Sequence, residues 1–301
     1  MKYIFLLILL IIIIFYYLNY LFKKKHEHFD NYSLDKYRTI WMYWETLPGK
    51  TKPGYIDLCI NTVKFNCGKC FNIIVLNEKS ITKYLPEIKN IDFSNLELPQ
   101  KVDYYRYALL EKYGGVWLDA DIMLLKCICP FFKKLQDTDY VGFGCGYDQN
   151  ICKETLNGHS KPLNWFMISK KDTPFIKCVK NKAYNKIIET NKSNKKLPYH
   201  SIGKVILGEC YEKLNKNSKW NYTHIPSKCQ EYDTKGNKLN NIMKKFEFKD
   251  CEEERIFFPL YNTAPGYPDW FKNLSEEDIK NNNDLFIKPI IDKAFQNNDD
   301  C

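Results

Sequence analysis

The chain has 301 residues, of which 45% are hydrophobic, 27% charged and 16% aromatic. This balance excludes a largely disordered chain and leaves room for one large domain or two small ones. The formal net charge of +9 is spread over many lysines and suits anionic partners such as nucleotides or acidic lipid. The sequence has no nucleic-acid-binding motif and no concentrated arginine patch, so we expect no nucleic-acid partner.

An uninterrupted apolar segment lies near the start of the chain. Ile4 to Phe22 has no charged side chain, and a helix that spans a bilayer needs about 20 such residues. A cleaved signal peptide is the alternative, but its apolar core has roughly 7–15 residues and precedes a small-residue cleavage site, which this segment lacks. We therefore predict a transmembrane anchor over residues 1–22, a polar tether over 23–38 and a globular domain over 39–301.

The side of the membrane on which the domain lies stays open. Three lysines at residues 23–25 follow the apolar segment, and the positive-inside rule would keep the domain in the cytoplasm. Four Asn-x-Ser/Thr sequons and 12 cysteines fit a lumenal domain of the Golgi or endoplasmic reticulum type instead. Cys67 with Cys70, and Cys127 with Cys129, could form a four-thiolate zinc site. Their spacing matches no familiar zinc finger, so buried thiols or disulfides are favoured.

The globular domain begins with a strand, a helix and a second strand. Residues 39–44 are β-branched and aromatic, residues 55–65 carry apolar side chains at helical spacing, and residues 71–77 form a continuous apolar run. A run of this kind is typical of a strand that is buried on both faces. The order predicts a βαβ unit and a mostly parallel sheet with flanking helices, in which ligands bind beyond the carboxyl ends of the strands.

The rest of the domain continues the α/β pattern. Pro99 precedes a predicted helix over 102–112, and Gly114 and Gly115 end it, one of them in a left-handed conformation. Further strands are predicted at 116–125, 140–147, 164–170 and 255–261, and further helices at 173–190 and 199–214. The polar tail after Leu274 reads as helical or frayed.

Four charged residues stand out in the stretch KVDYYRYALLEKYGGVWLDADIMLLK. On a helix, Asp103 and Arg106 are three apart and share a face. In an extended segment, Asp119 and Asp121 point the same way, and two neighbouring carboxylates repel each other unless a cation lies between them. Mn²⁺ or Mg²⁺ meets this need with hard oxygen ligands that it often shares with substrate phosphates. A solvated strand end with a surface ion pair is the alternative.

The whole run, D-x-x-R-x-x-x-L-x-x-x-G-G-x-W-L-D-x-D, resembles the DXD motif region of GT-A glycosyltransferases. It is most similar to the capsular polysaccharide synthesis and sugar-binding-DXD families, which are related to yeast Golgi mannosyltransferases and clostridial glucosylating toxins. The segments IWMYW, CINTVKFN and FNIIVLNE resemble the start of the same families. The resemblance covers residues 39–125 and, less closely, 164–214. It implies a GT-A-like, Rossmann-like fold.

The resemblance also implies roles for individual residues. Asp121 matches the acid that binds Mn²⁺ directly, and Asp119 matches the acid that contacts the donor ribose or sugar and reaches the metal through water. Asp103 matches an acid that holds the donor sugar or ribose. Arg106 matches an arginine at the donor, where its planar fork suits phosphate or sugar oxygens. Trp44 stands where these families place an aromatic ring against the nucleotide base; a core tryptophan is the alternative.

Two further assignments follow from the resemblance. Asn164 is similar to an asparagine that these families place near the donor or acceptor. A third metal ligand often comes from the C-terminal part of GT-A enzymes, and the candidates are His200, His224 and Asp269. Each of these three is otherwise an ordinary structural or surface residue.

The resemblance implies a metal-dependent glycosyltransferase that moves a sugar from a nucleotide-diphosphate sugar to a hydroxyl of a glycan or polysaccharide, with retention of configuration. A metal-dependent phosphoesterase is one alternative, and it requires further His and Asp ligands, whereas the chain has only five His. A non-catalytic membrane or surface protein on a degenerate transferase fold is the other. That alternative predicts loss of one of the four charged residues, yet all four are present.

Overall fold

The computed structural model describes residues 13–17, 19, 34–144, 162–193, 196–215, 222–226, 255–260 and 267–296. The chain divides into two units, residues 1–37 and 38–301. In the first unit, residues 13–17 and 19 are helical. No helix within the described ranges has the length and apolar character needed to cross a membrane, and most of the predicted anchor, Ile4 to Phe22, lies outside them.

A six-stranded sheet forms the centre of the second unit, in the order β2-β1-β3-β6-β5-β7. The β1 strand pairs in parallel with β2 on one side and β3 on the other, β5 pairs in parallel with β7, and β6 runs antiparallel to both β3 and β5. The predicted mixed α/β fold with a mostly parallel sheet is therefore confirmed. The strands are β1 (Thr39–Tyr43), β2 (Asn72–Leu76), β3 (Gly115–Leu118), β5 (Tyr140–Gly144), β6 (Pro162–Ser169) and β7 (Tyr222–Pro226).

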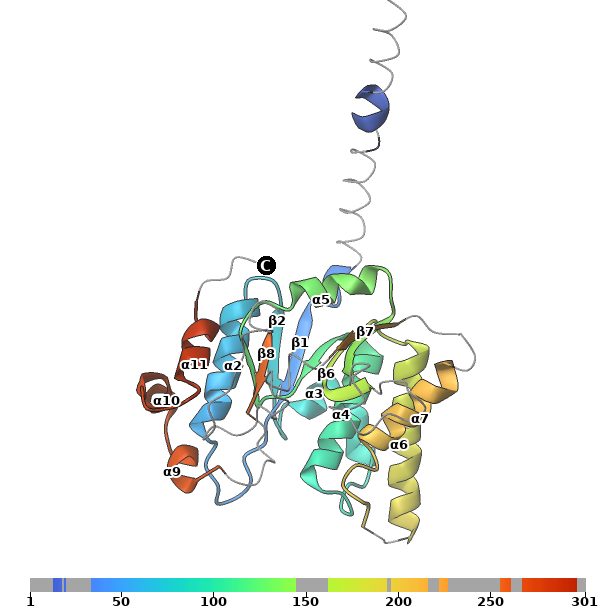
Figure 1. Ribbon diagram of the computed structural model, residues 1–301. Coiled ribbons are helices and arrows are strands. Elements are labelled where there is room, and N and C mark those ends of the chain that lie inside the picture. Colours follow the sequence, from blue (N-terminus) through green and yellow to red (C-terminus); the bar gives the residue numbers. More distant parts are fainter. Residues whose placement is uncertain are drawn as a thin grey trace, which may run out of the picture. The chain divides into compact units, whose positions relative to one another are not determined.

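Helices pack on both sides of this sheet (Figure 1). The chain passes from β1 through α2 (Gly54–Cys67) to β2, and then through α3 (Ile81–Tyr84), a 3₁₀ turn (Pro86–Asn90) and α4 (Leu98–Tyr113) to β3. Since β2 and β3 flank β1 on opposite sides, these two right-handed crossovers place α2 and α4 on opposite faces. The order of the strands reverses between β1 and β3, and such a switch point opens a crevice at the carboxyl ends of the strands.

The long helix α4 begins four residues before its predicted start and has clear end signals. Glu97 and Gln100 form a capping box, in which each side chain accepts a hydrogen bond from the other residue's backbone N–H. Pro99 lies in the first turn, where its missing N–H is tolerated. Gly114 and Gly115 follow the helix with φ of 70° and 97°, a backbone region that favours glycine. The chain can therefore turn directly from α4 into β3.

Three predicted elements differ from the structure. The β2 strand was expected to be buried on both faces, but it lies at the edge of the described sheet, and Val75 is 36% exposed. The predicted strand over 116–125 is two strands, β3 and β4 (Ile122–Leu124), because Asp119 to Asp121 form a turn between them. The predicted helix over 199–214 is α7 (Lys204–Asn215), and turns occupy residues 199–203.

A second, two-stranded sheet joins β4 to β8 (Phe257–Pro259). The C-terminal part of the chain therefore packs beside the turn of residues 119–121, which we call the acid turn. The predicted strand over 255–261 is thereby confirmed, in shortened form. The polar tail after Leu274 forms two short helices, α10 (Glu276–Asn281) and α11 (Lys288–Ala294). With α9 (Asp269–Lys272), which precedes the tail, they lie along α2 (Figure 1). The remaining described elements are α5 (Cys129–Lys133), a 3₁₀ turn (Lys134–Gln136) and α6 (Pro174–Ser193).

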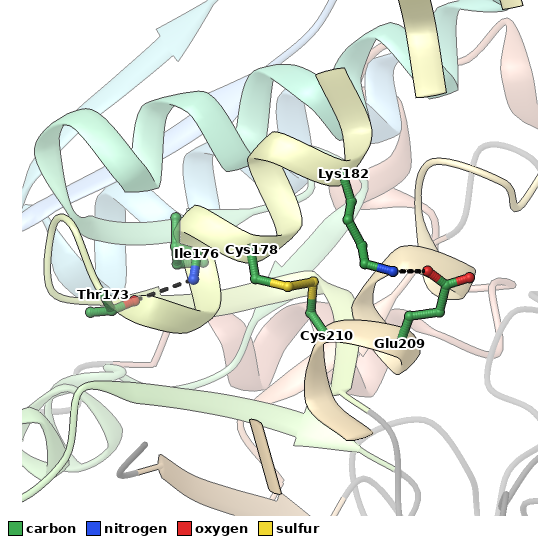
Figure 2. The surroundings of a disulfide bond; sticks show 6 residues. All are labelled: Thr173, Ile176, Cys178, Lys182, Glu209 and Cys210. Carbon is green, nitrogen blue, oxygen red and sulfur yellow. Dashed lines mark hydrogen bonds and ion pairs between the residues drawn. A yellow bond between two sulfur atoms is a disulfide. The ribbon is translucent and has the colours of Figure 1, made fainter. Parts of the chain in front are cut away.

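A disulfide joins the two helices that follow β6. Cys178 in α6 is bonded to Cys210 in α7, and the pair is 32 residues apart in sequence (Figure 2). An ion pair between Lys182 and Glu209 lies beside it. Because α6 packs against α4 and α7 packs against β6, the disulfide fixes α7 next to the part of the sheet where the site residues lie.

Candidate active site

A pocket of about 970 Å³ opens at the switch point, where the carboxyl ends of β1 and β3 meet the first residues of β6. Residues from α4, the acid turn, the segment before α7 and the start of α9 complete its walls. It brings together most of the residues singled out in the sequence, although they come from six parts of the chain. These are Trp44, Asp103, Arg106, Asp119, Asp121, Asn164, His200 and Asp269.

The two acids of the motif lie in a turn rather than along one strand. The Ile122 N–H donates to the Asp119 carbonyl at 3.2 Å, which closes the turn. The Asp119 N–H donates to the Trp165 carbonyl at 2.9 Å, and the Leu260 N–H donates to the Asp121 carbonyl at 2.7 Å. Both acids line the pocket because these hydrogen bonds fix the turn between the two sheets, not because side chains alternate along an extended strand.

Arg106 joins two carboxylates from different elements. Its Nη2 lies 3.1 Å from Asp103 Oδ1 and its Nη1 lies 3.2 Å from Asp119 Oδ1, and Nη1 also donates to the Asn164 carbonyl. The guanidinium lies 5.0 Å from the ring centre of Trp117, whose Nε1 donates to Asp119 Oδ1 at 2.7 Å. The arginine side chain is only 6% exposed, so these contacts hold the two acids in place.

Burial and charge shift the pKa values of this group in opposite directions. Burial raises the pKa of Asp103 to about 6, against the lowering effect of Arg106. Burial likewise raises the pKa of Asp119, which Arg106 and the Trp117 N–H counteract. Burial would lower the pKa of Arg106, but Asp119 and Asp103 outweigh it and raise that pKa. The arginine therefore stays charged, and Asp103 titrates close to neutral pH.

Asn164 and Gly203 enclose the Asp103 carboxylate. The Asn164 Nδ2 donates to Asp103 Oδ1 at 2.8 Å. A Cβ atom on Gly203 would lie 2.6 Å from Asp103 Oδ2 and 3.0 Å from Asn164 Nδ2, closer than side chains can approach. The absence of a side chain at Gly203 therefore allows the segment before α7 to pack directly against the acid.

The remaining predicted residues occupy the rim and one end of the pocket. Trp44 follows β1, is half-buried, and its backbone N–H donates to the Leu76 carbonyl at 2.9 Å. His200 is exposed, and Asp269 pairs with Lys272 at 3.5 Å with its side chain 92% exposed. His224 belongs to β7, but its side chain lies outside the described residues. Within the described ranges, no three His, Cys, Asp or Glu side chains are close enough to hold a metal together.

Three lysines that sequence reasoning missed also line the pocket: Lys50, Lys204 and Lys272. They come from the loop after β1, the start of α7 and α9, so no local spacing connects them. In a chain with 45 Lys and Arg, a single lysine in the sequence does not indicate a binding site.

The cysteines of the two short motifs form no zinc site among the described residues. Cys67 is a buried free thiol, and Cys127 belongs to a disulfide whose other half is not described.

The sheet order and the pocket define an α/β protein with a pocket at the switch point of its sheet. The sequence model of the family described as "Capsular polysaccharide synthesis protein" matches residues 13–263. The chain therefore belongs to the capsular polysaccharide synthesis protein family. This membership confirms the expected class, a glycosyltransferase. None of the curated proteins compared with the chain matches it.

Several solved glycosyltransferases are similar to part of this chain at low sequence identity. The PaToxG glycosyltransferase is 16% identical over 65% of this chain and 80% of its own, with a TM-score of 0.36. A glycosyltransferase involved in glycosylation of the major capsid of PBCV-1 is 15% identical over 75% of this chain and 94% of its own, with a TM-score of 0.41. An active-site mutant of LgtC is 14% identical over 65% of this chain and 75% of its own, with a TM-score of 0.36.

Proposed function

We propose that the protein moves a sugar from a nucleotide-diphosphate sugar to a hydroxyl of a glycan or polysaccharide, with Mn²⁺ or Mg²⁺ as cofactor and on a GT-A-like fold. The observation that carries this proposal is the network of Asp103, Arg106 and Asp119, which shares one pocket with Asp121 at the switch point of the sheet. Ligands of α/β sheets bind at such a point. The network presents largely buried acids, held in place by Arg106, where a sugar donor would bind.

Strand order suggests how the donor lies. The β1, β3 and β6 strands are neighbours, about 4.8 Å apart, so the pocket crosses roughly 10 Å of the sheet edge from Trp44 to Asn164. We place the base against Trp44 at the end of β1 and the diphosphate at the acid turn after β3. The sugar then lies against the hydrogen-bonded pair of Asp103 and Asn164.

The acid turn fits a hard divalent cation. Asp119 and Asp121 offer carboxylate oxygens from one turn, the ligand type that Mn²⁺ and Mg²⁺ prefer, and Asp269 or His200 at the same pocket is the candidate third ligand. When bound, the metal neutralises negative charge on the departing diphosphate. Lys50, Lys204 and Lys272 line the same pocket and bring further positive charge to the phosphates.

Arg106 and Asp103 have different roles in the proposed transfer. Arg106 is a positioning residue, because both of its terminal nitrogens are engaged by Asp103, Asp119 and the Asn164 carbonyl. Asp103 accepts a hydrogen bond from a donor-sugar hydroxyl. The acceptor oxygen bonds to the anomeric carbon, the bond from that carbon to the diphosphate breaks, and the diphosphate leaves with the electron pair and takes the hydroxyl proton. This transfer needs no separate protein base, and it gives retention of configuration because the acceptor attacks from the same face that the diphosphate leaves.

Location is proposed from two observations. The apolar segment Ile4 to Phe22 would anchor the chain as a single-pass membrane protein. The disulfide between Cys178 and Cys210 favours a catalytic domain in an oxidising, lumenal or external compartment, because cytosolic thiols are kept reduced. This disulfide therefore supports the lumenal orientation over the cytoplasmic one.

Thermal unfolding of the full chain with a panel of nucleotide-diphosphate sugars, with and without Mn²⁺, tests the proposal. One donor should raise Tm only when metal is present. Asp121→Asn should remove that shift and the transfer activity, while its Tm without ligand stays within about 2 °C of wild type. Asp284→Asn, which changes an exposed acid away from the pocket, is the matched control.

The alternatives give different results in the same experiment. A surface protein on a degenerate transferase fold would show no metal-dependent shift with any donor. A phosphoesterase would release phosphate from p-nitrophenyl phosphate instead of transferring sugar. An Asp121→Asn variant with unchanged turnover would refute the assignment of the metal to the acid turn.

A further inference from the structure

The pocket continues past Asp103 along one face of α4. Pro99, Val102, Asp103 and Arg106 all line it, and their spacing of three, four and seven residues places them on one side of the helix. Because a helix rises 1.5 Å per residue, this face extends about 10 Å from Arg106 to Pro99. The end of this face at Asp103 and Arg106, which with Asp119 form the acid network, is polar. The end at Pro99 and Val102 is apolar.

The opposite wall of this extension comes from the start of β6 and the segment before α7. Leu163, Tyr199 and His200 line the pocket there. The Tyr199 side chain is 45% exposed, and its ring centre lies 4.9 Å from that of His200 at an angle of 84°. An aromatic ring with an accessible face therefore borders the pocket next to aliphatic side chains.

Buried hydrogen bonds hold this wall in place. Gln100, which is 1% exposed, donates from Nε2 to the carbonyls of Leu197 and Pro198 at 3.3 and 3.1 Å, and its Oε1 accepts from the Glu97 N–H at 3.1 Å. On the other side of the segment, the Tyr107 hydroxyl donates to the Ile202 carbonyl at 3.4 Å. Residues 197–202 are thus tied to α4 at both ends.

We propose that this extension is the acceptor subsite and that it binds a pyranose ring of the acceptor glycan against Tyr199. The inference rests on the proposed function, because a donor that fills the pocket from Trp44 to Asp103 leaves this extension open to the acceptor. From Asp103 to Pro99 the helix face extends about 6 Å, the length of one sugar ring. Sugar rings present C–H faces that pack on aromatic side chains such as that of Tyr199.

The subsite also orients the reacting hydroxyl. A ring held between Tyr199 and Val102 lies directly beside Asp103, where the donor sugar is placed. Its hydroxyl oxygen can then form the bond to the anomeric carbon as the bond to the diphosphate breaks. Tyr199 thereby determines which acceptors are used, while the acid network acts on the donor.

The test uses the full chain with its preferred donor, Mn²⁺ and a panel of p-nitrophenyl pyranosides as acceptors. Tyr199→Ala should raise the KM for the acceptor at least tenfold and the KM for the donor less than threefold. Tyr199→Phe, which keeps the ring, should stay within threefold of wild type for both. Tyr184→Ala removes a tyrosine of similar exposure, 40%, on α6 outside the pocket and should change neither value.

Each contrary outcome has its own meaning. An acceptor KM within twofold of wild type in Tyr199→Ala, or equal increases in both KM values, would overturn the acceptor subsite. A wild-type enzyme that hydrolyses a donor in water but uses none of the pyranosides would overturn the pyranose assignment. A wild type that neither binds nor hydrolyses any donor would refute the proposed function itself, and the acceptor subsite with it.

Discussion

Replacing Arg106 by methionine would remove the cation between two carboxylates and keep a side chain of similar length. Asp103 is 9% and Asp119 26% exposed, and each lies within 3.2 Å of the guanidinium. Removing one partner from a buried ion pair costs about 3–5 kcal/mol, because the other charge is left uncompensated. Water reaches Asp119 and screens part of this effect, so we expect a loss of about 3 kcal/mol near pH 8.

The loss should depend on pH in a defined direction. Without Arg106, the pKa of Asp103 should rise beyond the value of about 6 that burial already gives it. A carboxyl whose pKa is higher in the folded state binds more protons when folded, so stability falls as pH rises through the window from about 4 to that raised value. The variant should therefore be closer to wild-type stability at pH 5 than at pH 8.

Thermal and urea unfolding, followed by tryptophan fluorescence, measure both effects. For a domain of this size, about 3 kcal/mol corresponds to a Tm decrease of roughly 6–12 °C. Lys112→Met is the matched control: Lys112 lies on the same helix and also pairs with an acid at 3.2 Å, but that pair is 37% and 46% exposed. Exposed pairs contribute about 0–1 kcal/mol. Equal losses in the two variants, or a loss in Arg106→Met that ignores pH, would refute this account.

Two further predictions concern Asp103. Because burial raises the pKa of Asp103 to about 6, kcat/KM should fall about tenfold per pH unit below that value. Asp103→Asn should have a much lower activity that no longer falls with pH in this range. A wild-type profile without a decline between pH 7 and pH 5 would contradict the role of Asp103. Gly203→Ala should lower kcat by at least tenfold, because the new methyl group would lie 2.6 Å from Asp103 Oδ2, while Val205→Ala on the exposed side of α7 should have no effect. Wild-type kcat in Gly203→Ala would show that the acid moves aside without consequence.

The acids and the arginine could be predicted because their geometry is mostly local. Asp103 and Arg106 are three residues apart, so they share one helix face wherever the helix lies in the fold. Asp119 and Asp121 are two residues apart in one turn. The turn itself was not predictable from the motif alone. It depends on Leu260, directly after β8 and more than 130 residues later, whose N–H donates to the Asp121 carbonyl.

The opposite wall of the pocket depends on contacts between distant segments. Gln100 donates to the carbonyls of Leu197 and Pro198, almost a hundred residues later in the sequence. Gly203 packs against Asp103 at a similar separation in sequence. Neither residue type signals such a contact in sequence. The β2 strand shows the same limit for the fold, since an apolar run predicts a strand but not whether a neighbour covers both of its faces.

The disulfide between Cys178 and Cys210 closes a covalent ring around the segment that carries Tyr199 and Gly203. Closing a loop of this length lowers the entropy of the unfolded chain by an amount worth about 4 kcal/mol. Doubling the length of a flexible loop costs only about 0.6 kcal/mol of closure free energy. Residues can therefore be inserted or exchanged between α6 and α7 while both helices stay docked. Side chains in residues 196–201 can therefore be exchanged without rebuilding the domain that carries the acids, as long as Gly203 stays against Asp103.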